Sequence, residues 1–398
     1  MWAGRHVVVG VSGGIASYKS CILVRRLAEA GARVDVILTE GAAEFVRPLT
    51  FAALSGRPAL ASLWTSDAAL QHVRLAQKAE LVIVAPATAN LLARAAQGLG
   101  DDLLTTLLLA RAGPVLYAPA MNDQMYAHPA TRANIALLAA RGARFVGPET
   151  GSLAEGPSDR PGRMSEPEII LAHAARLIRS TGPLAGRRVL VTAGPTREAL
   201  DPVRVITNRS SGKMGYRLAE AAWERGAEVL LVTGPVVLPP PVGVEIEQVE
   251  TTADMEAAIR VALPAADVLS MAAAPADYRP RSPAATKRPR EAGQLNIEMI
   301  PTDDILSGTL NLRKPGSLIV GFALETGEAV VRGMAKLERK HLDLIVVNDA
   351  LEPGAGFEVE TNRVVILDKA GHQDVVPLAS KREVANRILD AVEARLGR

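Results

Sequence analysis

The chain has 398 residues, of which 48% are hydrophobic, 22% charged and only 3% aromatic, and 45 basic side chains nearly balance 43 acidic ones. This usage excludes a disordered or fibrous chain, and a formal net charge of +2 carries no electrostatic signature of nucleic-acid or membrane-surface binding. The single cysteine, Cys21, excludes an intrachain disulfide framework and a multi-cysteine metal site, and it favours the reducing cytoplasm. The length predicts two domains.

The first half alternates strand and helix patterns. We expect strands at residues 6–10, 33–38, 81–85, 114–117 and 144–146, and helices at residues 15–30, 101–112, 130–141 and 169–179. Strands that alternate with helices predict a parallel sheet with right-handed crossovers. The opening apolar run is too short for a signal peptide, and the longest apolar stretch, residues 103–110, is too short to span a bilayer.

A second alternating unit follows a linker at residues 181–186. We expect its strands at residues 188–192, 228–232, 267–271, 317–322, 342–347 and 363–367, its helices at residues 213–225, 253–263 and 381–396, and a loop at residues 276–294. The predicted fold class is therefore α/β, with two tandem doubly wound, mostly parallel-sheet (Rossmann-like) domains. We place the first domain at residues 1–180 and the second at residues 187–398.

Three polar or glycine-containing loops follow strands of the first half: residues 12–16 (Ser-Gly-Gly-Ile-Ala), residues 86–90 (Pro-Ala-Thr-Ala-Asn) and residues 118–122 (Ala-Pro-Ala-Met-Asn). Open parallel sheets bind ligands at the carboxyl ends of their strands, and a glycine loop before a helix suits a phosphate. The spacing is not G-x-G-x-x-G, so a dinucleotide is disfavoured. Plain strand-to-helix turns, capped by Thr88 or Asn90, are the alternative interpretation.

The second half carries a comparable loop. Ser210, Ser211 and Gly212 precede a predicted helix and offer hydroxyl and amide groups to an anion. The loop is not a Walker A motif, because Thr207 stands at the position of its first glycine and Met214 at the position of its Ser or Thr.

Four charged residues further along the second half are candidates for a nucleotide or metal site. Asp277 is a candidate for a ribose or a metal ion, and Lys287 for a triphosphate. Lys336 and Lys340 lie four residues apart on one predicted helix face, where they repel each other unless an anion lies between them. A solvated helix face is the alternative for these two lysines.

Taken together, the motifs resemble the bifunctional coenzyme A biosynthesis family, in which phosphopantothenoylcysteine decarboxylase is fused to phosphopantothenate–cysteine ligase. The resemblance covers about residues 5–395. In the first half it rests on residues 12–16, Thr39-Glu40, His72, residues 86–90 and residues 119–122 with Met125, the pattern of flavin-containing cysteine decarboxylases. It implies a flavodoxin-like FMN domain whose cofactor-binding residues are Ser12, Gly13, Gly14, Ile15, Ala16, Thr39, Pro86, Ala87, Thr88, Ala89 and Asn90.

The resemblance also implies a decarboxylation chemistry. FMN oxidises the thiol end of the substrate to a thioaldehyde, the carboxylate leaves as CO2, and the enethiolate is reduced and protonated. His72 matches the catalytic histidine, although a lone histidine is more often structural, and Asn122 matches the residue that holds the substrate carboxylate.

One residue departs from the family pattern in the substrate flap. The family reads Gly-x-x-Ala-Cys-Gly there, and its cysteine donates a proton; residues 151–156 of this chain carry Glu155 at that position. Carboxyl groups in water are ionised at neutral pH and poor proton donors, but an apolar enclosure reverses this. Either Glu155 replaces the thiol, or the flavin domain is impaired and serves as the oligomerisation scaffold of a monofunctional ligase.

For the second half, the resemblance implies CTP-dependent ligation of 4'-phosphopantothenate with cysteine through an acyl-cytidylate, assisted by Mg2+. Asn208 stabilises that intermediate, and Asp277 is the metal candidate. The residues implied to bind the nucleotide are Ser210, Ser211, Gly212, Lys213, Met214, Ala273, Asp277, Lys287, Thr302, Asp303, Asp304, Ile305, Phe322, Lys336 and Lys340. Asp303 replaces the usual proline of the base loop, and the basic cluster around Lys287 is degenerate, which leaves the preference for CTP less secure.

The resemblance further implies a homo-oligomer with trimeric flavin domains, dimeric ligase domains and a dodecameric whole, without nucleic-acid or membrane partners. Two other classes stay open. A nicotinamide-dependent dehydrogenase is disfavoured because neither half contains G-x-G-x-x-G. A flavin-binding regulatory protein without catalysis is the other.

Overall fold

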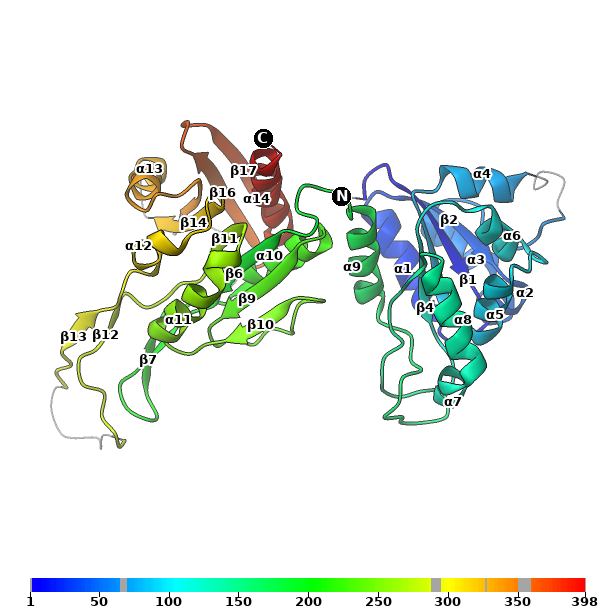
Figure 1. The fold of residues 1–398 in the computed structure, drawn as a ribbon, viewed down its shortest axis with the longest axis horizontal. Helices are drawn as coiled ribbons and strands as arrows, with labels where there is room; N and C mark the ends of the chain where they lie inside the picture. The colour runs from blue at the N-terminus through cyan, green and yellow to red at the C-terminus, as the bar shows by residue number, and fades with distance from the viewer. Residues whose placement is uncertain (1, 65–69, 288–294, 326–327, 350–358, 398) are drawn as a thin grey trace. The chain divides into compact units, whose positions relative to one another are not determined.

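The computed structural model describes residues 2–64, 70–287, 295–325, 328–349 and 359–397. The chain divides into two compact units, Met1–Ile178 and Arg179–Arg398, whose elements are labelled in Figure 1. Each unit is a layered α/β structure, as the sequence predicts, and each is described here by itself.

The first unit is built on a five-stranded parallel sheet in the order β2-β1-β3-β4-β5. Its strands are β1 (His6–Val11), β2 (Arg33–Leu38), β3 (Leu81–Ala87), β4 (Val115–Pro119) and β5 (Arg144–Phe145). The first three are almost continuous apolar runs because both faces of the sheet are covered. This strand order is the flavodoxin-like one.

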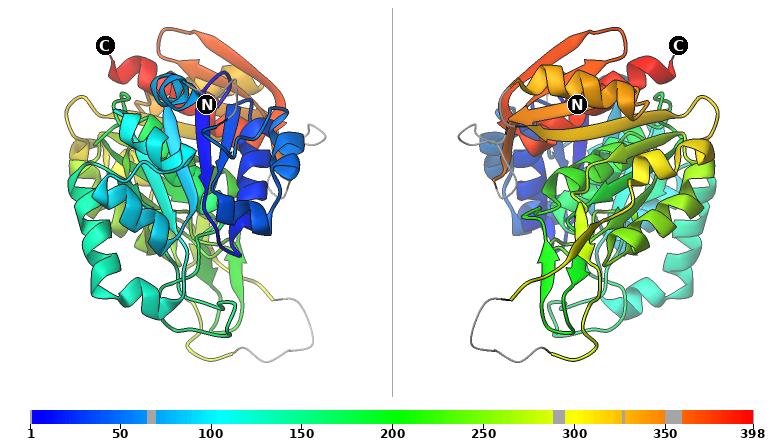
Figure 2. Two further views of the ribbon diagram at one scale, coloured as in Figure 1. Left: turned by 90° about the vertical axis from the view of Figure 1, so that its right-hand side faces the viewer. Right: turned by 90° about the vertical axis from the view of Figure 1, so that its left-hand side faces the viewer.

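Helices cover both faces of that sheet. Alternate strand residues such as Val7 and Val9 pack under α1 (Ser17–Glu29), α3 (Pro48–Ser55) and α9 (Pro167–Ile178). The residues between them pack under α4 (Gln71–Lys78), α5 (Ala89–Gln97), α6 (Leu103–Ala110) and α8 (Pro129–Ala140). The short helices α2 (Glu40–Phe45) and α7 (Asp123–Ala127) follow β2 and β4 at the carboxyl edge. Figure 2 shows the same chain from two further sides.

The second unit contains an eight-stranded sheet in the order β10-β9-β6-β11-β14-β15-β16-β17. The first six strands are parallel, and β16 and β17 are antiparallel at one end. The strands are β6 (Arg188–Ala193), β9 (Glu228–Thr233), β10 (Glu245–Gln248), β11 (Val268–Met271), β14 (Leu318–Glu325), β15 (Leu344–Asp349), β16 (Thr361–Asp368) and β17 (Gln373–Ser380). The parallel part has the doubly wound order, which reverses between β6 and β11.

Helices again cover both faces. One face lies under α10 (Lys213–Glu224) and α14 (Lys381–Leu396), and the other under α11 (Thr252–Ala262), α12 (Ile305–Gly308) and α13 (Ala329–Arg339). Short 3-10 turns, η1 (Leu263–Ala265) and η2 (Leu310–Leu312), follow α11 and α12.

A buried arginine joins the two helices of the first face. Arg225 is 1% exposed, and its guanidinium pairs with Asp390 at 2.8 Å and Glu393 at 2.7 Å on α14. Because a buried charge is costly unless it is paired, this ion cluster fixes α14 against α10.

The sequence-based boundaries agree with most of these elements within a few residues, but three expectations are wrong. Residues 276–294 are not all loop, because β12 (Tyr278–Pro280) pairs with β13 (Met299–Pro301). A second short pair, β7 (Arg197–Ala199) with β8 (Val205–Thr207), and the strand β17 were not predicted. Lys340 lies one residue beyond the end of α13 rather than on it. The three-residue strands β7, β12 and β13 contain charged residues or proline and give no clear alternation, which explains why they were missed.

Candidate functional sites

A cavity of about 1080 Å3 opens at the carboxyl edge of the first sheet. Its lining comes from the loops after β1, β2, β3 and β4 and from the segment at residues 152–164. It gathers most of the predicted cofactor residues, together with Asn122 and Glu155: Ser12, Gly13, Gly14, Ile15, Ala16, Thr39, Thr88, Ala89 and Asn90. Apolar side chains, including Ile15, Leu153 and Met164, supply surfaces that a flat ring would contact.

The loop after β1 is shaped for close backbone approach. A Cβ at Gly13 would lie 2.7 Å from the carbonyl carbon of Gly41, so a side chain there would push the β1–α1 and β2–α2 loops apart. The helix α1 begins after Ala16 without a side-chain cap. Its first amides are used within the chain, because the amides of Ser17 and Lys19 donate to the carbonyl oxygens of Gly14 and Ala16 at 3.0 Å each.

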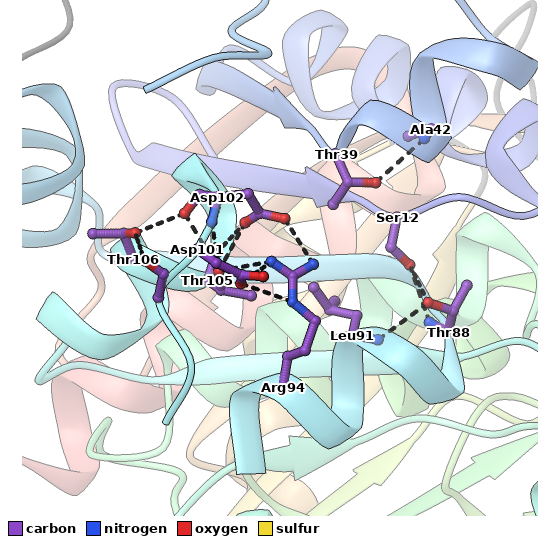
Figure 3. A network of polar contacts seen from close by, with 11 residues as sticks. Ser12, Thr39, Ala42, Thr88, Leu91, Arg94, Asp101, Asp102, Thr105 and Thr106 are labelled. Atoms are coloured by element: carbon purple, nitrogen blue, oxygen red, sulfur yellow. Dashed lines mark hydrogen bonds and ion pairs between the residues drawn. The ribbon is translucent and has the colours of Figure 1, made fainter. Parts of the chain in front are cut away.

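Ser12 ties this loop to the loop after β3 (Figure 3). Its hydroxyl donates to the carbonyl oxygen of Pro86 at 2.8 Å and accepts from the backbone amide of Thr88 at 3.0 Å. Thr88 also caps α5 by accepting from the amide of Leu91, so the capping interpretation is confirmed for Thr88, which lines the cavity as well. Pro86 and Ala87 do not line the cavity; both end β3, and Ala87 is fully buried.

An arginine–aspartate cluster forms another part of the cavity wall, and the sequence interpretation missed it. Arg94 contacts Asp101 through Nε at 2.9 Å and Asp102 through Nη1 at 2.9 Å (Figure 3). The hydrogen bond from Arg94 lowers the pKa of Asp101. Asp102 accepts from the amide of Thr105 and thereby caps α6, which fixes the cluster. Arg94 and Asp101 are seven residues apart on either side of a turn, and no helix or strand periodicity predicts such a contact, so only the fold reveals it.

The flap at residues 147–164 lies beside Asn122, whose side chain is held in one orientation. Its Oδ1 accepts from the amides of Gln124 at 2.9 Å and Met125 at 3.4 Å, so its Nδ2 is left to donate. That Nδ2 donates to Oε1 of Glu155 at 2.8 Å. The amide that the resemblance assigns to the substrate carboxylate thus already binds a carboxylate.

Two other residues bear on the flap and its proton donor. Lys19 of α1 is buried, and its Nζ donates to the carbonyl oxygen of Met164 at 2.9 Å and pairs with Glu166 at 3.0 Å, which anchors the end of the flap. Cys21 lies inside α1 and does not line the cavity, so it does not replace the missing flap thiol.

His72 lies on α4 and does not line this cavity. Its Nδ1 is buried and has no hydrogen-bond partner among the residues that the structure describes. The structure of a single chain therefore does not bring His72 to the flap.

A second cavity, of about 780 Å3, opens at the carboxyl edge of the eight-stranded sheet. It contains Asn208 and all the predicted nucleotide-binding residues except Lys287: Ser210, Ser211, Gly212, Lys213, Met214, Ala273, Asp277, Thr302, Asp303, Asp304, Ile305, Phe322, Lys336 and Lys340. It also contains polar residues that the sequence interpretation missed, among them Arg339, Asn362 and Lys381.

Asn208 joins two of the loops that form this cavity. Its Nδ2 donates to the carbonyl oxygens of Ala274 at 3.2 Å and Pro275 at 3.0 Å. Gly212 has φ +73°, and a Cβ on it would lie 3.3 Å from the backbone nitrogen of Gly194. Glycine therefore suits this position, where the backbone is left-handed and lies close to a second loop. The loop ahead of α10 is therefore held close to the loop after β11.

The lysines from the α13 region are held rather than solvated. Nζ of Lys336 donates to the carbonyl oxygen of Phe322 at 2.9 Å, and burial lowers the pKa of this lysine. Lys340 forms an ion pair with Asp304, and burial lowers its pKa also. These contacts disfavour the alternative of a fully solvated helix face.

Asp277 is an exposed carboxylate that lines this cavity. No group of three or more His, Cys, Asp or Glu side chains in the described part of the chain could hold a metal ion by itself. One carboxylate together with nucleotide phosphates is the usual protein site of Mg2+, so Asp277 fits a metal that arrives with a nucleotide.

Two family models match, one for each unit. Residues 1–179 match the flavoprotein model, and residues 184–396 match the model of the DNA/pantothenate metabolism flavoprotein C-terminal domain. Together with the fold and the cavities, the matches define a flavoprotein joined to a pantothenate-metabolism domain. The flavoprotein match confirms the expected flavin cofactor of the first unit.

Full-length relatives carry both parts. The coenzyme A biosynthesis bifunctional protein CoaBC of Vibrio cholerae is 45% identical over 398 residues, which cover 99% of each chain. Its counterpart from Mycobacterium tuberculosis is 47% identical over 403 residues, covering 98% of this chain and 96% of that one. Among solved structures, the C-terminal domain of a CoaBC protein is 40% identical and covers 55% of this chain and 99% of that chain, with a TM-score of 0.47.

The chain belongs to the family of bifunctional coenzyme A biosynthesis proteins. It is a bifunctional enzyme with a decarboxylase half and a ligase half, as the sequence predicts. The alternative of a monofunctional ligase is not favoured. Among the residues that the structure describes, no helix combines the length and apolar character needed to cross a bilayer.

Proposed function

We propose that the first domain, residues 1–180, binds FMN and decarboxylates phosphopantothenoylcysteine to 4'-phosphopantetheine. The cavity at the carboxyl edge supports this, because it combines a glycine loop with apolar side chains that a flat ring would contact. FMN, when bound, supplies the two-electron acceptor that makes loss of CO2 feasible. The remaining steps concern residues of this chain.

Asn122 and Glu155 are the residues that we assign to the substrate end of this cavity. Asn122 Nδ2 binds the substrate carboxylate in the place that Glu155 Oε1 occupies in the structure. Glu155 then leaves the amide and donates a proton to the decarboxylated intermediate, in the role of the family's cysteine. A carboxyl group serves as this acid when the closed flap excludes water.

We assign His72 to the base of this reaction in a flavin site shared between subunits. The position of His72 outside the cavity of its own chain is consistent with a site completed by a second copy. The proposed assembly is the one that the resemblance implies, with trimeric flavin domains, dimeric ligase domains and twelve copies in all.

The second domain, residues 187–398, is proposed to join 4'-phosphopantothenate to cysteine with CTP and Mg2+. Attack of the substrate carboxylate on the α-phosphorus gives an acyl-cytidylate and releases pyrophosphate, and the cysteine amine then displaces CMP. Asn208 stabilises the intermediate, Asp277 holds Mg2+ through the phosphates, and Lys336 and Lys340 contact the nucleotide. Lys287 lies outside the cavity lining and is proposed to reach the triphosphate from its loop.

The observation that carries the proposal is the meeting of residues 208–214, 272–277, 302–306 and 322–324 with Lys336 and Lys340 in one cavity. The test is pyrophosphate release by the full chain with CTP, 4'-phosphopantothenate and cysteine, with each omitted in turn and with ATP, GTP and UTP in place of CTP. Release that requires all three substrates supports the ligase. No release with any nucleotide contradicts it, and a preparation without flavin absorbance contradicts the first half of the proposal.

A further inference from the structure

One arginine outside the ligase cavity binds the backbone of two helical segments that line it. Arg313 directly follows η2 and is not part of the cavity lining, and the resemblance assigns it no role. Its Nη2 donates to the carbonyl oxygen of Leu306 on α12 at 3.0 Å and to that of Lys340 at 3.2 Å. Its Nη1 donates to the carbonyl oxygen of His341 at 2.7 Å. A single guanidinium thus joins α12 to the end of α13.

The end of α13 is a Schellman turn in which a histidine takes the place usual for glycine. The amide of Leu342 donates back to the carbonyl oxygen of Leu337 at 3.0 Å, as this turn requires. His341 has φ +50°, a left-handed conformation that is unfavourable for a residue with a side chain. Carbonyl groups at a helix end lack partners within the helix, and Arg313 supplies donors to those of Lys340 and His341. Its positive charge also lies at the negative end of the α13 dipole.

The two segments that Arg313 joins supply different parts of the cavity lining. Residues 302–306 comprise the base loop (302–304) and the first residues of α12, and Lys336 and Lys340 come from the α13 region. Within the cavity the same segments meet again, because Lys340 forms an ion pair with Asp304. A bound phosphate would compete with Asp304 for that ammonium group. It would not compete for the backbone carbonyl groups that Arg313 binds, so this link persists when the side chain of Lys340 turns to a ligand.

We propose that Arg313 is a positioning residue of the ligase, which holds the base loop and the lysines of the α13 region at the separation that one nucleoside triphosphate spans. The inference rests on the proposed ligase function, in which the base loop contacts the base and Lys336 and Lys340 contact the phosphates. A guanidinium suits this role, because its donors form a rigid planar fork that reaches acceptors on two segments at once.

This role predicts a pattern of binding that a general loss of stability does not. CMP carries the base, and pyrophosphate corresponds to the two terminal phosphates of CTP, so each fragment meets mainly one of the two segments. CTP meets both segments, and its affinity exceeds that of the fragments only when their separation fits the ligand. Loss of the link should therefore weaken CTP more than it weakens either fragment.

The experiment compares Arg313→Gln and Arg313→Lys with the wild-type full chain by isothermal titration calorimetry, with CTP, CMP and pyrophosphate as probes in the presence of Mg2+. The matched control is Arg111→Gln in the flavin unit. Arg111 also binds three carbonyl oxygens, those of Ala76, Ala79 and Glu80. In both arginines Nε is buried without a hydrogen-bond partner among the described residues. Thermal unfolding shows that each variant is folded, and initial rates of pyrophosphate release give KM and kcat for CTP.

We expect CTP to bind Arg313→Gln at least about 10-fold more weakly, while CMP and pyrophosphate stay within about twofold of the wild type. In the rate measurement, KM for CTP should rise and kcat should stay close to the wild-type value. Arg313→Lys keeps the charge but loses the planar fork, so its affinity for CTP should lie between those of Arg313→Gln and the wild type. Arg111→Gln should change none of these quantities.

Two outcomes overturn the positioning role. One is an unchanged affinity for CTP in folded Arg313→Gln, and the other is an equal weakening of CTP, CMP and pyrophosphate, because it indicates a general distortion of the cavity. If Arg313→Gln does not fold, Arg313→Lys is judged by the same criteria. A wild-type protein that binds none of the three probes refutes the proposed function, whereas the two outcomes above refute only the role of Arg313.

Discussion

Replacing Glu155 with Gln separates two roles that the structure allows for this side chain. Glu155 accepts a hydrogen bond from Asn122 Nδ2 at 2.8 Å, and the orientation of that amide is fixed by two backbone donors. A glutamine keeps an acceptor oxygen at the same position, so the flap still closes on Asn122. What it loses is the negative charge and the proton that a carboxyl group transfers.

The two roles predict effects of different size. A hydrogen bond to a charged group contributes about 1.5–3 kcal/mol and a neutral one about 0.5–1.5 kcal/mol, so weaker flap closure costs about 1 kcal/mol, or roughly fivefold in rate. General acid catalysis contributes about 100- to 10,000-fold. We expect the larger loss in Glu155→Gln, with activity recovered in Glu155→Cys, which restores the family's flap thiol.

The assay is single-turnover formation of 4'-phosphopantetheine, followed together with CO2 release and the flavin spectrum. Glu149→Gln is the control on the same flap, because Glu149 holds the flap through its backbone atoms. A Glu155→Gln enzyme within about fivefold of the wild type would show that this residue closes the flap and transfers no proton. Loss of flavin from the variant would mean that the cavity itself had changed.

Three further predictions concern the second unit. Burial lowers the pKa of Lys381 to about 8, so the unfolded chain binds more protons than the folded chain between about pH 8 and 10.5. The free energy of unfolding, measured with urea, should therefore rise across that pH window, and Lys381→Met should reduce the rise. Asn208→Asp points a carboxylate at two carbonyl oxygens and removes two hydrogen bonds, so ligase turnover should fall about 30-fold or more while flavin absorbance is unchanged. Arg225→Met removes the buried cation that pairs with Asp390 and Glu393 of α14 and should cost about 1.5–3 kcal/mol, seen as a lower unfolding temperature of the ligase unit; an unchanged temperature would contradict the role of this ion cluster.

The sequence predicted the parts of both sites that follow parallel strands. Apolar runs such as residues 6–11 and 188–193 identified the strands, and the loops after them had to meet at the carboxyl edges. The structure accordingly brings residues 12–16 beside residues 88–90, and residues 210–214 beside residues 273–277.

The site residues that the sequence could not predict meet through contacts whose spacing in the chain follows neither helix nor strand periodicity. Arg94 meets Asp101 across a turn, and Asn362 and Lys381 reach the ligase cavity only because the last two strands are antiparallel. Nor did any pattern indicate that His72 lies outside the cavity of its own chain. The β12–β13 pair was missed because strands of three residues that contain proline carry no alternation.

The antiparallel ending of the larger sheet makes the ligase site depend on a late part of the chain. A frameshift or stop codon between β15 and β16 would leave the flavin unit complete, yet it would remove the cavity wall that carries Asn362 and Lys381, and with α14 the partners of the buried Arg225. Such a shortened protein should remain yellow while losing ligation. A truncation late in the chain should therefore abolish the ligase activity while the flavin unit is retained.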